Sequence, residues 1–362
     1  MNTICIILIT STITACIPGN RQHHFSEATM IPETFKAMIV HSTSEVHHEL
    51  RIAGKSIRDL PAGDVLIQVM YSSLNYKDAL SATGNRGVTR TYPHTPGIDA
   101  AGIVAESSHS AFVSGDPVLV TGYDLGMNTS GGFGRYVRVP ADWVVKLPEN
   151  LSLKESMIYG TAGFTASLSV QKIVEHGLTP DSGDILVTGA TGGVGSLAVS
   201  ILSKIGYSVT AATGKTDQND FLRSLGAKTV ISRADIADNS ERPLLKARWA
   251  GVVDTVGGDI LASALKSTFQ RAAITCCGNV ASPSFAATVY PFILRGITLY
   301  GVDSASTPMP LRQKIWRKIA GEWKIGHLDL LHTEIPLEGL KQAIVRMLSG
   351  GQHGRVIVRL GH

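Results

Sequence analysis

The residues most clearly suited to chemistry form one glycine-rich segment, Thr188-Gly189-Ala190-Thr191-Gly192-Gly193-Val194-Gly195. An apolar run typical of a buried strand, residues 184–188, leads into it, and residues 194–205 follow with the spacing of an amphipathic helix. Glycines at such a turn let the backbone approach a pyrophosphate closely, and the helix N-terminus adds unpaired N–H groups. The segment therefore predicts a dinucleotide-binding site to which all of its residues contribute.

The residues after the second strand, 209–212, indicate which dinucleotide is bound. An NAD site usually carries an acid there for the ribose 2′-hydroxyl, whereas an NADP site carries a cation. Here Thr213, Gly214 and Lys215 follow the strand, and no acid occurs before Asp217. Lys215 can pair with a 2′-phosphate, and Thr213 can donate a hydrogen bond to it. We therefore expect the cofactor to be NADPH.

Two stretches with different patterns must position these residues. Residues 36–155 combine short β-type runs with Gly/Pro turns, which is typical of a small barrel or sandwich. From about residue 160 short strands alternate with helices, which predicts a doubly wound parallel sheet and an α/β fold class. The final strand, 356–358, is expected to return to the first domain. The other expected strands are 65–69, 117–121, 137–139, 184–188, 209–212, 229–231, 252–254 and 273–275, and the helices are 194–205, 220–225 and 260–269.

Charge and cysteine content exclude several other functions. The chain has 33 basic and 29 acidic residues and no long basic run, so no nucleic-acid partner is indicated. Its four cysteines are Cys5, Cys16, Cys276 and Cys277. This spacing predicts neither a disulfide framework nor a paired-CxxC zinc site.

The first 29 residues are set apart from the fold. Residues 4–17 are uncharged and mostly apolar, but a membrane-spanning helix needs about 20 residues, so no stable membrane span is expected. Residues 13–16 resemble a lipoprotein cleavage box, yet no Lys or Arg precedes the apolar stretch. We interpret residues 1–29 as a non-globular extension ahead of a start near Met30, in a cytoplasmic protein. A signal-like segment on an exported lipoprotein is the alternative.

Several further motifs accompany the glycine-rich turn. They are Ser72-Ser73-Leu74-Asn75-Tyr76-Lys77-Asp78-Ala79-Leu80, Pro96-Gly97-Ile98-Asp99, Gly160-Thr161-Ala162-Gly163-Phe164-Thr165-Ala166, Pro291-Phe292-Ile293-Leu294-Arg295-Gly296 and Gly301-Val302-Asp303-Ser304. With them the chain resembles the medium-chain dehydrogenase/reductase superfamily, and within it the zinc-independent quinone oxidoreductases and acryloyl-CoA reductases of the YhdH/YhfP type. The resemblance runs from about Lys36 to Leu360.

The resemblance implies an order of domains. A GroES-like catalytic domain, residues 36–158 and 293–362, would be interrupted by a Rossmann NADPH-binding domain, residues 159–292, with the active site in the cleft between them. Homodimers are common among the members, so a homodimer is a further possibility.

The resemblance also bears on the metal. Zinc alcohol dehydrogenases of the superfamily place a cysteine ligand where this chain has Asn75, and Gly-His-Glu where it has Gly97-Ile98-Asp99. A catalytic zinc site needs three protein ligands. Because both of the first ligands are replaced, we predict that the protein binds no metal.

A metal-free site of this kind suits the reduction of a C=C bond conjugated to a carbonyl, in which hydride reaches the β-carbon and a proton the α-carbon. Tyr76 is the first catalytic candidate, because a phenol can contact the nicotinamide and donate a hydrogen bond or a proton. In the family, the tyrosine of this motif contacts NADP. Asn75 could orient the cofactor or the substrate carbonyl. By resemblance, Asn279, Ile293 and Ser304 would contact the nicotinamide half.

These inferences lead to one expected function and two alternatives. We expect an NADPH-dependent oxidoreductase that converts a short 2-enoyl thioester, of the acryloyl-CoA type, to the saturated acyl thioester. The first alternative is a reductase of quinones or other enones. The second is a non-catalytic NADPH-binding sensor or scaffold.

Overall fold

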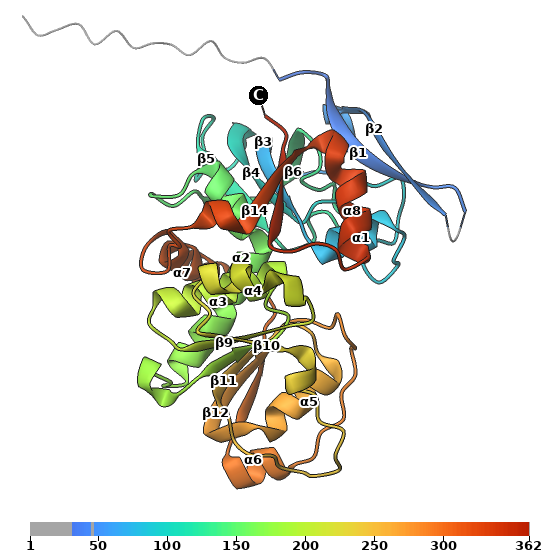
Figure 1. The fold of residues 1–362 in the computed structure, drawn as a ribbon. Coiled ribbons are helices and arrows are strands. Elements are labelled where there is room, and N and C mark those ends of the chain that lie inside the picture. The colour runs from blue at the N-terminus through green and yellow to red at the C-terminus, as the bar shows by residue number, and fades with distance from the viewer. Residues whose placement is uncertain (1–30, 45–46, 362) are drawn as a thin grey trace, which may run out of the picture. The chain divides into compact units, whose positions relative to one another are not determined.

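The computed structural model describes residues 31–44 and 47–361, and in that part of the chain a parallel sheet has the strand order β10-β9-β8-β11-β12-β13 (Figure 1). The interpretation of residues 1–29 lies outside the described residues. The order reverses between β8 and β11, and a sheet of this kind binds its ligand at the carboxyl edge beside that reversal. The strands are β8 (Ile185–Val187), β9 (Val209–Thr213), β10 (Thr229–Ser232), β11 (Trp249–Asp254), β12 (Thr268–Cys276) and β13 (Thr298–Gly301).

Helices cover both faces of this sheet, because alternate side chains of its strands are apolar on either side. Ile185 and Val187 belong to the core beneath α3, whereas Leu186 and Val252 belong to the core beneath α5. One predicted boundary is wrong: the helix expected over 260–269 ends earlier, because β12 begins directly after it. The helices are α3 (Gly193–Lys204), α4 (Asn219–Ser224), α5 (Gly258–Lys266) and α6 (Tyr290–Arg295).

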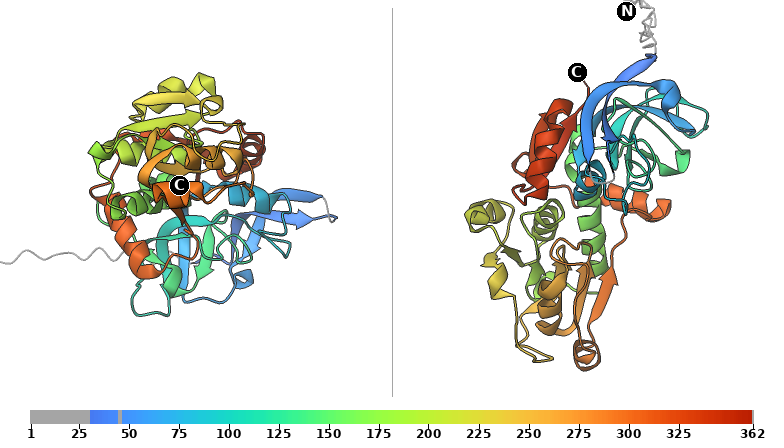
Figure 2. Two further views of the ribbon diagram at one scale, coloured as in Figure 1. Left: turned by 90° about the horizontal axis from the view of Figure 1, so that it is seen from below. Right: turned by 90° about the vertical axis from the view of Figure 1, so that its right-hand side faces the viewer.

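The second sheet is mainly antiparallel and has the order β14-β15-β3-β4-β5-β7, with β6 paired to β3. As expected, the final strand returns to this domain and pairs antiparallel with β3. A hairpin of β1 and β2, drawn in blue in Figure 2, lies at the edge of the domain. The strands are β1 (Thr34–Ser42), β2 (His48–Ser56), β3 (Val65–Leu74), β4 (Asp99–Ser107), β5 (Pro117–Thr121), β6 (Tyr136–Val139), β7 (Val145–Lys146), β14 (His332–Pro336) and β15 (Arg355–Arg359).

One long helix, α2 (Leu153–Glu175), packs against both sheets, through β3 and β4 on one side and β12 on the other. The domain boundary expected after residue 158 falls inside this helix. β13, which pairs with β12 in the parallel sheet, lies beyond the boundary expected after residue 292, and the domain bounds stay a prediction. The β-rich domain and the Rossmann sheet confirm the predicted fold class. The remaining helices are α1 (Tyr76–Ala82), α7 (Met309–Ala320) and α8 (Leu340–Leu348).

Candidate active site

A cavity of about 780 Å³ lies at the carboxyl edge of the parallel sheet and is also lined by residues that follow β3 and β5. It brings together most of the residues that the sequence indicated, although they come from distant segments of the chain. These residues are Asn75, Tyr76, Thr188, Gly189, Thr191, Gly192, Gly193, Val194, Gly195, Thr213, Gly214, Lys215 and Ser304.

Three of the expected cofactor contacts do not line the cavity. Ala190 is fully buried, and its N–H donates to the carbonyl of Ala212 at 3.0 Å. Asn279 is exposed, although its neighbour Val280 does line the cavity. Ile293 lies on α6 and is 67% exposed. The segment of Asn279 thus reaches the cavity through Val280, whereas Ile293 lies at an exposed position of α6, and both contacts stay predictions.

The glycine turn has the shape that a pyrophosphate needs. A Cβ atom on Gly195 would overlap the carbonyl of Gly189, so the chain can turn this tightly only with glycine. Gly192 caps α3 without any side-chain hydrogen bond, which leaves the N–H groups of the first helical turn facing the cavity. These N–H groups and the helix dipole favour an anion at this position.

Two threonines of this region hold the turn together. Thr188 Oγ1 donates to Asp254 Oδ1 at 2.7 Å and accepts from the N–H of Thr255 at 3.0 Å. Thr213 Oγ1 accepts from the N–H of Lys215 at 3.0 Å and lies 3.3 Å from Thr191 Oγ1. Both hydroxyls therefore shape the loops on which the expected ligand contacts lie.

The charged residues of the cavity are mostly cations. Lys77, Lys215, Arg233 and Arg355 line it, whereas Asp303 is the one acidic residue among the described residues of its lining. Burial lowers the pKa of Lys215, whose Nζ donates to the carbonyl of Gln352. Such a distribution suits a ligand with several negative charges.

Sequence reasoning missed Arg233, which directly follows β10. Its guanidinium lies against Gly214, where it would contact any Cβ atom added at that residue. Because β10 is the parallel neighbour of β9, the residues that follow both strands meet at one edge of the sheet. The expected strand over 229–231 could therefore have placed Arg233 beside Lys215.

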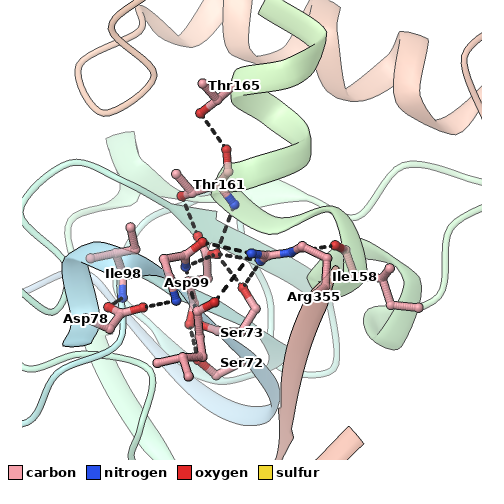
Figure 3. Close-up of polar contacts among 11 residues, drawn as sticks. Ser72, Ser73, Asp78, Ile98, Asp99, Ile158, Thr161, Thr165 and Arg355 are labelled. Carbon is pink, nitrogen blue, oxygen red and sulfur yellow. Dashed lines mark hydrogen bonds and ion pairs between the residues drawn. The ribbon is translucent and has the colours of Figure 1, made fainter. Parts of the chain in front are cut away.

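A buried polar network around Asp99 and Arg355 (Figure 3) also includes Asn75. Asn75 Nδ2 donates to Asp99 Oδ2 at 2.8 Å, and Asn75 Oδ1 accepts from Arg355 Nη1 at 3.2 Å. Asp99 Oδ2 also accepts from Ser73 Oγ at 2.5 Å and from the Thr161 N–H at 2.9 Å. The amide of Asn75 is thus already engaged, and it ties the start of α1 to β4 and β15.

Arg355 and Asp78 complete this network. Arg355 is 3% exposed and donates to the Ile158 carbonyl at 3.0 Å and to Ser73 Oγ at 2.8 Å. Asp78 accepts the N–H of Asn75 and of Ile98, each at 2.8 Å. Burial, with Asp99 nearby, raises the pKa of Asp78 to about 7. The network therefore joins β3, β4, α1, α2 and β15 directly beneath the cavity.

These residues do not fit a zinc ion at the position where zinc-dependent members of the superfamily bind it. The carboxylate of Asp99 is surrounded by donors from Ser73, Asn75 and Thr161. The Arg355 guanidinium, itself a cation, occupies the remaining side at 3.9 Å from Asp99 Oδ2. Zinc prefers thiolate and imidazole ligands, and in the described residues no three His, Cys, Asp or Glu side chains cluster. The absence of a metal stays a prediction.

Tyr76 begins α1 and lies at the rim of the cavity, where it is 40% exposed. In the described part of the chain its hydroxyl has no protein hydrogen-bond partner. Lys77 follows it, with Nζ 3.9 Å from Met127 Sδ. The ring of Tyr76 is therefore well placed to cover a flat ligand, while its hydroxyl is not held in one position.

The site and fold together define a two-domain, dinucleotide-dependent oxidoreductase. Comparisons with protein-family models agree: an alcohol dehydrogenase GroES-like domain matches residues 61–149, and a zinc-binding dehydrogenase domain matches residues 193–320. No helix in residues 31–44 or 47–361 is long and apolar enough to cross a membrane.

Three similar proteins indicate the branch of these oxidoreductases to which the chain belongs. YhfP of Bacillus subtilis, assigned by name to the quinone oxidoreductases, is 47% identical over 84% of this chain and 93% of its own length. The acrylyl-CoA reductase AcuI of Ruegeria pomeroyi is 41% identical over 90% of this chain and 98% of its own length. The Salmonella enterica YhdH oxidoreductase, solved with NADP, has 40% identity and a TM-score of 0.87, covering 90% of this chain and 99% of that one. YhfP has been solved with NAD bound, with a TM-score of 0.88.

The chain therefore belongs to the medium-chain dehydrogenase/reductase superfamily, in the branch of YhdH/YhfP-type quinone oxidoreductases and acryloyl-CoA reductases. It is an oxidoreductase.

Proposed function

We propose that this protein uses NADPH to reduce the C=C bond of a short 2-enoyl thioester, of the acryloyl-CoA type. The observation that carries the proposal is the single cavity that contains both the glycine turn and Tyr76. The similarity to AcuI, a named acrylyl-CoA reductase, supports the substrate class. NADPH, when bound, supplies the hydride.

The topology assigns the two halves of the dinucleotide to two groups of residues. In a sheet of this order, one half of the ligand lies over the strands on one side of the reversal and the other half lies over the strands on the opposite side. Lys215 and Arg233 follow β9 and β10, where they can pair with a 2′-phosphate. Ser304 follows β13 on the other side and so belongs to the nicotinamide end.

At the nicotinamide end, this chain's residues position the reactants. The ring of Tyr76 covers one side of the cavity rim, and Asn75 fixes the start of α1 through its contacts with Asp99 and Arg355. Holding the donor and the acceptor in contact removes much of the entropic cost of their meeting.

Removing either cation near the 2′-phosphate should weaken NADPH binding selectively. For Lys215→Ala and for Arg233→Ala we expect the Kd for NADPH to rise about tenfold or more, because a charge-assisted hydrogen bond contributes ~1.5–3 kcal/mol. The Kd for NADH, which lacks the 2′-phosphate, should change little. Nucleotide fluorescence titrations measure both constants. Lys204→Ala, an exposed lysine at the far end of α3, is the control. Equal losses for NADPH and NADH would remove the reason for preferring NADPH.

A panel of acceptors tests the substrate class. With NADPH in excess, kcat/KM for acryloyl-CoA should exceed that for simple quinones, as measured by the loss of NADPH absorbance. Fast turnover of quinones with none of acryloyl-CoA would assign the protein to the quinone alternative. NADPH binding without turnover of either acceptor class would favour the sensor or scaffold.

A cytoplasmic location follows from the use of NADPH in this proposal. The homodimer implied by the family stays a prediction.

A further inference from the structure

Arg312, on α7, is a buried cation that the expected site does not explain. It is fully buried, and its hydrogen bonds within the described residues all go to neutral oxygens, with Asp99 and Asp303 acting on it only as more distant charges. Burial lowers its pKa, and its contact with Tyr123 acts against that shift. An unpaired buried cation is costly, so its neighbours must compensate for the loss of water.

Neutral oxygens provide this compensation. An arginine has five N–H donors, and each one is used here. Nη1 donates to the carbonyl and the hydroxyl of Thr121 at 2.7 and 3.0 Å. Nη2 donates to the carbonyls of Ser304 and Ala305, both at 3.0 Å, and Nε donates to Tyr123 Oη at 3.2 Å. Arg312 thus ties the end of β5 to the loop after β13, and both segments line the cavity.

Tyr123 is held through its backbone and its ring. Its backbone φ is 52°, a conformation uncommon for residues other than glycine. Its N–H donates to the Ala305 carbonyl at 2.9 Å, and its ring stacks on Trp143 at a centroid distance of 5.4 Å. The Arg312 guanidinium carbon lies 4.3 Å from the centre of the same ring. Strained backbone that is fixed so firmly is often found at functional sites.

The hydroxyl of Tyr123 is the part of this residue that can still donate a hydrogen bond. Its oxygen accepts from Arg312, while in the described residues its proton has no acceptor within hydrogen-bonding distance. A phenol whose oxygen accepts from a cation is polarised and donates its own proton more strongly. Tyr123 lines the cavity beside Ser304, which is the end assigned above to the nicotinamide.

We propose that Tyr123 donates a hydrogen bond to the carbonyl oxygen of the acceptor and that Arg312 is its positioning residue; this inference rests on the proposed function. Hydride addition at the β-carbon breaks the C=C π bond, and the electron pair moves through the α-carbon to the carbonyl oxygen. The Tyr123 O–H and the Arg312 charge stabilise that oxygen as it becomes an enolate. The reduced dinucleotide supplies the hydride and is oxidised, and the α-carbon takes its proton from water.

The geometry favours Tyr123 over Tyr76 for this task. An oxyanion donor must be in place before the reaction, because reorienting it during the reaction would cost part of the stabilisation. Tyr76 is exposed at the rim and its hydroxyl is unanchored, whereas that of Tyr123 is fixed by Arg312. Tyr76 is left with the positioning of the nicotinamide ring.

The experiment compares Tyr123→Phe with Tyr300→Phe in the full-length chain. Tyr300 lies on β13 outside the cavity lining, and its hydroxyl bonds to His176 at 2.9 Å, so it loses one comparable hydrogen bond. For Tyr123→Phe we expect kcat with acryloyl-CoA to fall about 100-fold, which is typical for the loss of one oxyanion donor, with the Kd for NADPH unchanged. Tyr300→Phe should turn over normally.

A second acceptor separates chemistry from distortion. When a quinone is reduced, the developing negative charge spreads over the quinone ring, so this reaction should need the Tyr123 hydroxyl less. Tyr123→Phe should therefore slow quinone reduction by less than tenfold. Equal losses with both acceptors, or normal turnover of acryloyl-CoA by Tyr123→Phe, would overturn the proposal. A wild-type protein that reduces quinones but not acryloyl-CoA would overturn the proposed thioester substrate. The role of Tyr123 would then be tested by comparing the loss of quinone turnover in Tyr123→Phe with that in Tyr300→Phe. Inactivity with both would overturn both.

Two further measurements test the same proposal, and the first does not depend on the folding of Tyr123→Phe. A ring-fluorinated tyrosine at position 123 keeps the shape but makes the phenol more acidic, so the alkaline limb of the kcat profile should move to lower pH. An unmoved limb would contradict the proposal. Arg312→Lys should lower kcat in the wild type but add little in the Tyr123→Phe background, because it acts through the phenol. Equal effects in both backgrounds would show that Arg312 does not act through Tyr123.

Discussion

Replacing Gly160 with alanine is expected to lower the free energy of unfolding by about 3–5 kcal/mol, a large part of the stability of a typical domain. Gly160 interrupts α2 with φ 50° and ψ −156°, a combination used almost only by glycine. An added Cβ would lie 2.5 Å from Asp99 Oδ2, 2.6 Å from Ser73 Oγ and 2.8 Å from Arg355 Nη2. The methyl group would therefore displace the buried network beneath the cavity. Urea unfolding followed by circular dichroism measures the loss.

Gly296→Ala is the control that separates the steric overlap of the added methyl group from backbone strain. Gly296 has φ 60°, and a Cβ there would meet nothing within 4 Å. Its replacement should cost only the conformational penalty, about 1 kcal/mol. Similar losses in the two variants would mean that the network tolerates the extra methyl group. The Gly160→Ala variant should also bind NADPH less tightly, because Arg355 lines the cavity next to Gly193.

The sequence predicted the parallel sheet well because its signals are local. Strands buried on both faces are continuous apolar runs, and the residues around 185–187, 252–254 and 273–275 show this without any tertiary information. The glycine turn was equally clear, because a strand and a helix flank it. The end of α5 was misplaced, since no glycine or proline separates the helix from β12 and so no local signal marks where it ends.

The site residues that the sequence did not indicate are brought together by contacts between distant segments of the chain. Arg355 meets Ile158 and Ser73, and Arg312 meets Thr121, so no motif of nearby residues contains these pairs. The positive φ of Tyr123 has no signature in its residue type. The resemblance supplied Asn75 and Tyr76 but not their surroundings, and for that reason Asn75 was expected to orient a ligand although its amide is held by Asp99 and Arg355.

Removing the Arg355 side chain should have an effect comparable to that of Gly160→Ala. In Arg355→Met, Asp99 keeps its hydrogen-bond donors but loses the guanidinium that lies 3.9 Å from its Oδ2. The Ile158 carbonyl loses its hydrogen-bond donor. Breaking a buried pair by removing one partner costs ~3–5 kcal/mol. The control is Arg359→Met on the same strand, where the pair with Glu334 is about half exposed and should contribute less than about 1 kcal/mol.

A double-variant cycle shows how much of that cost belongs to the pair itself. Asp99→Asn combined with Arg355→Met removes both charges together, so the double variant should be less destabilised than the sum of the single ones. Additive losses would mean that Arg355 acts through its hydrogen bonds to Ile158 and Ser73 rather than through the charge of Asp99. In the wild type this side chain joins β15 to the Ile158 carbonyl of α2, two residues before the kink at Gly160, so the C-terminal strand and the kink meet at the same point of the network.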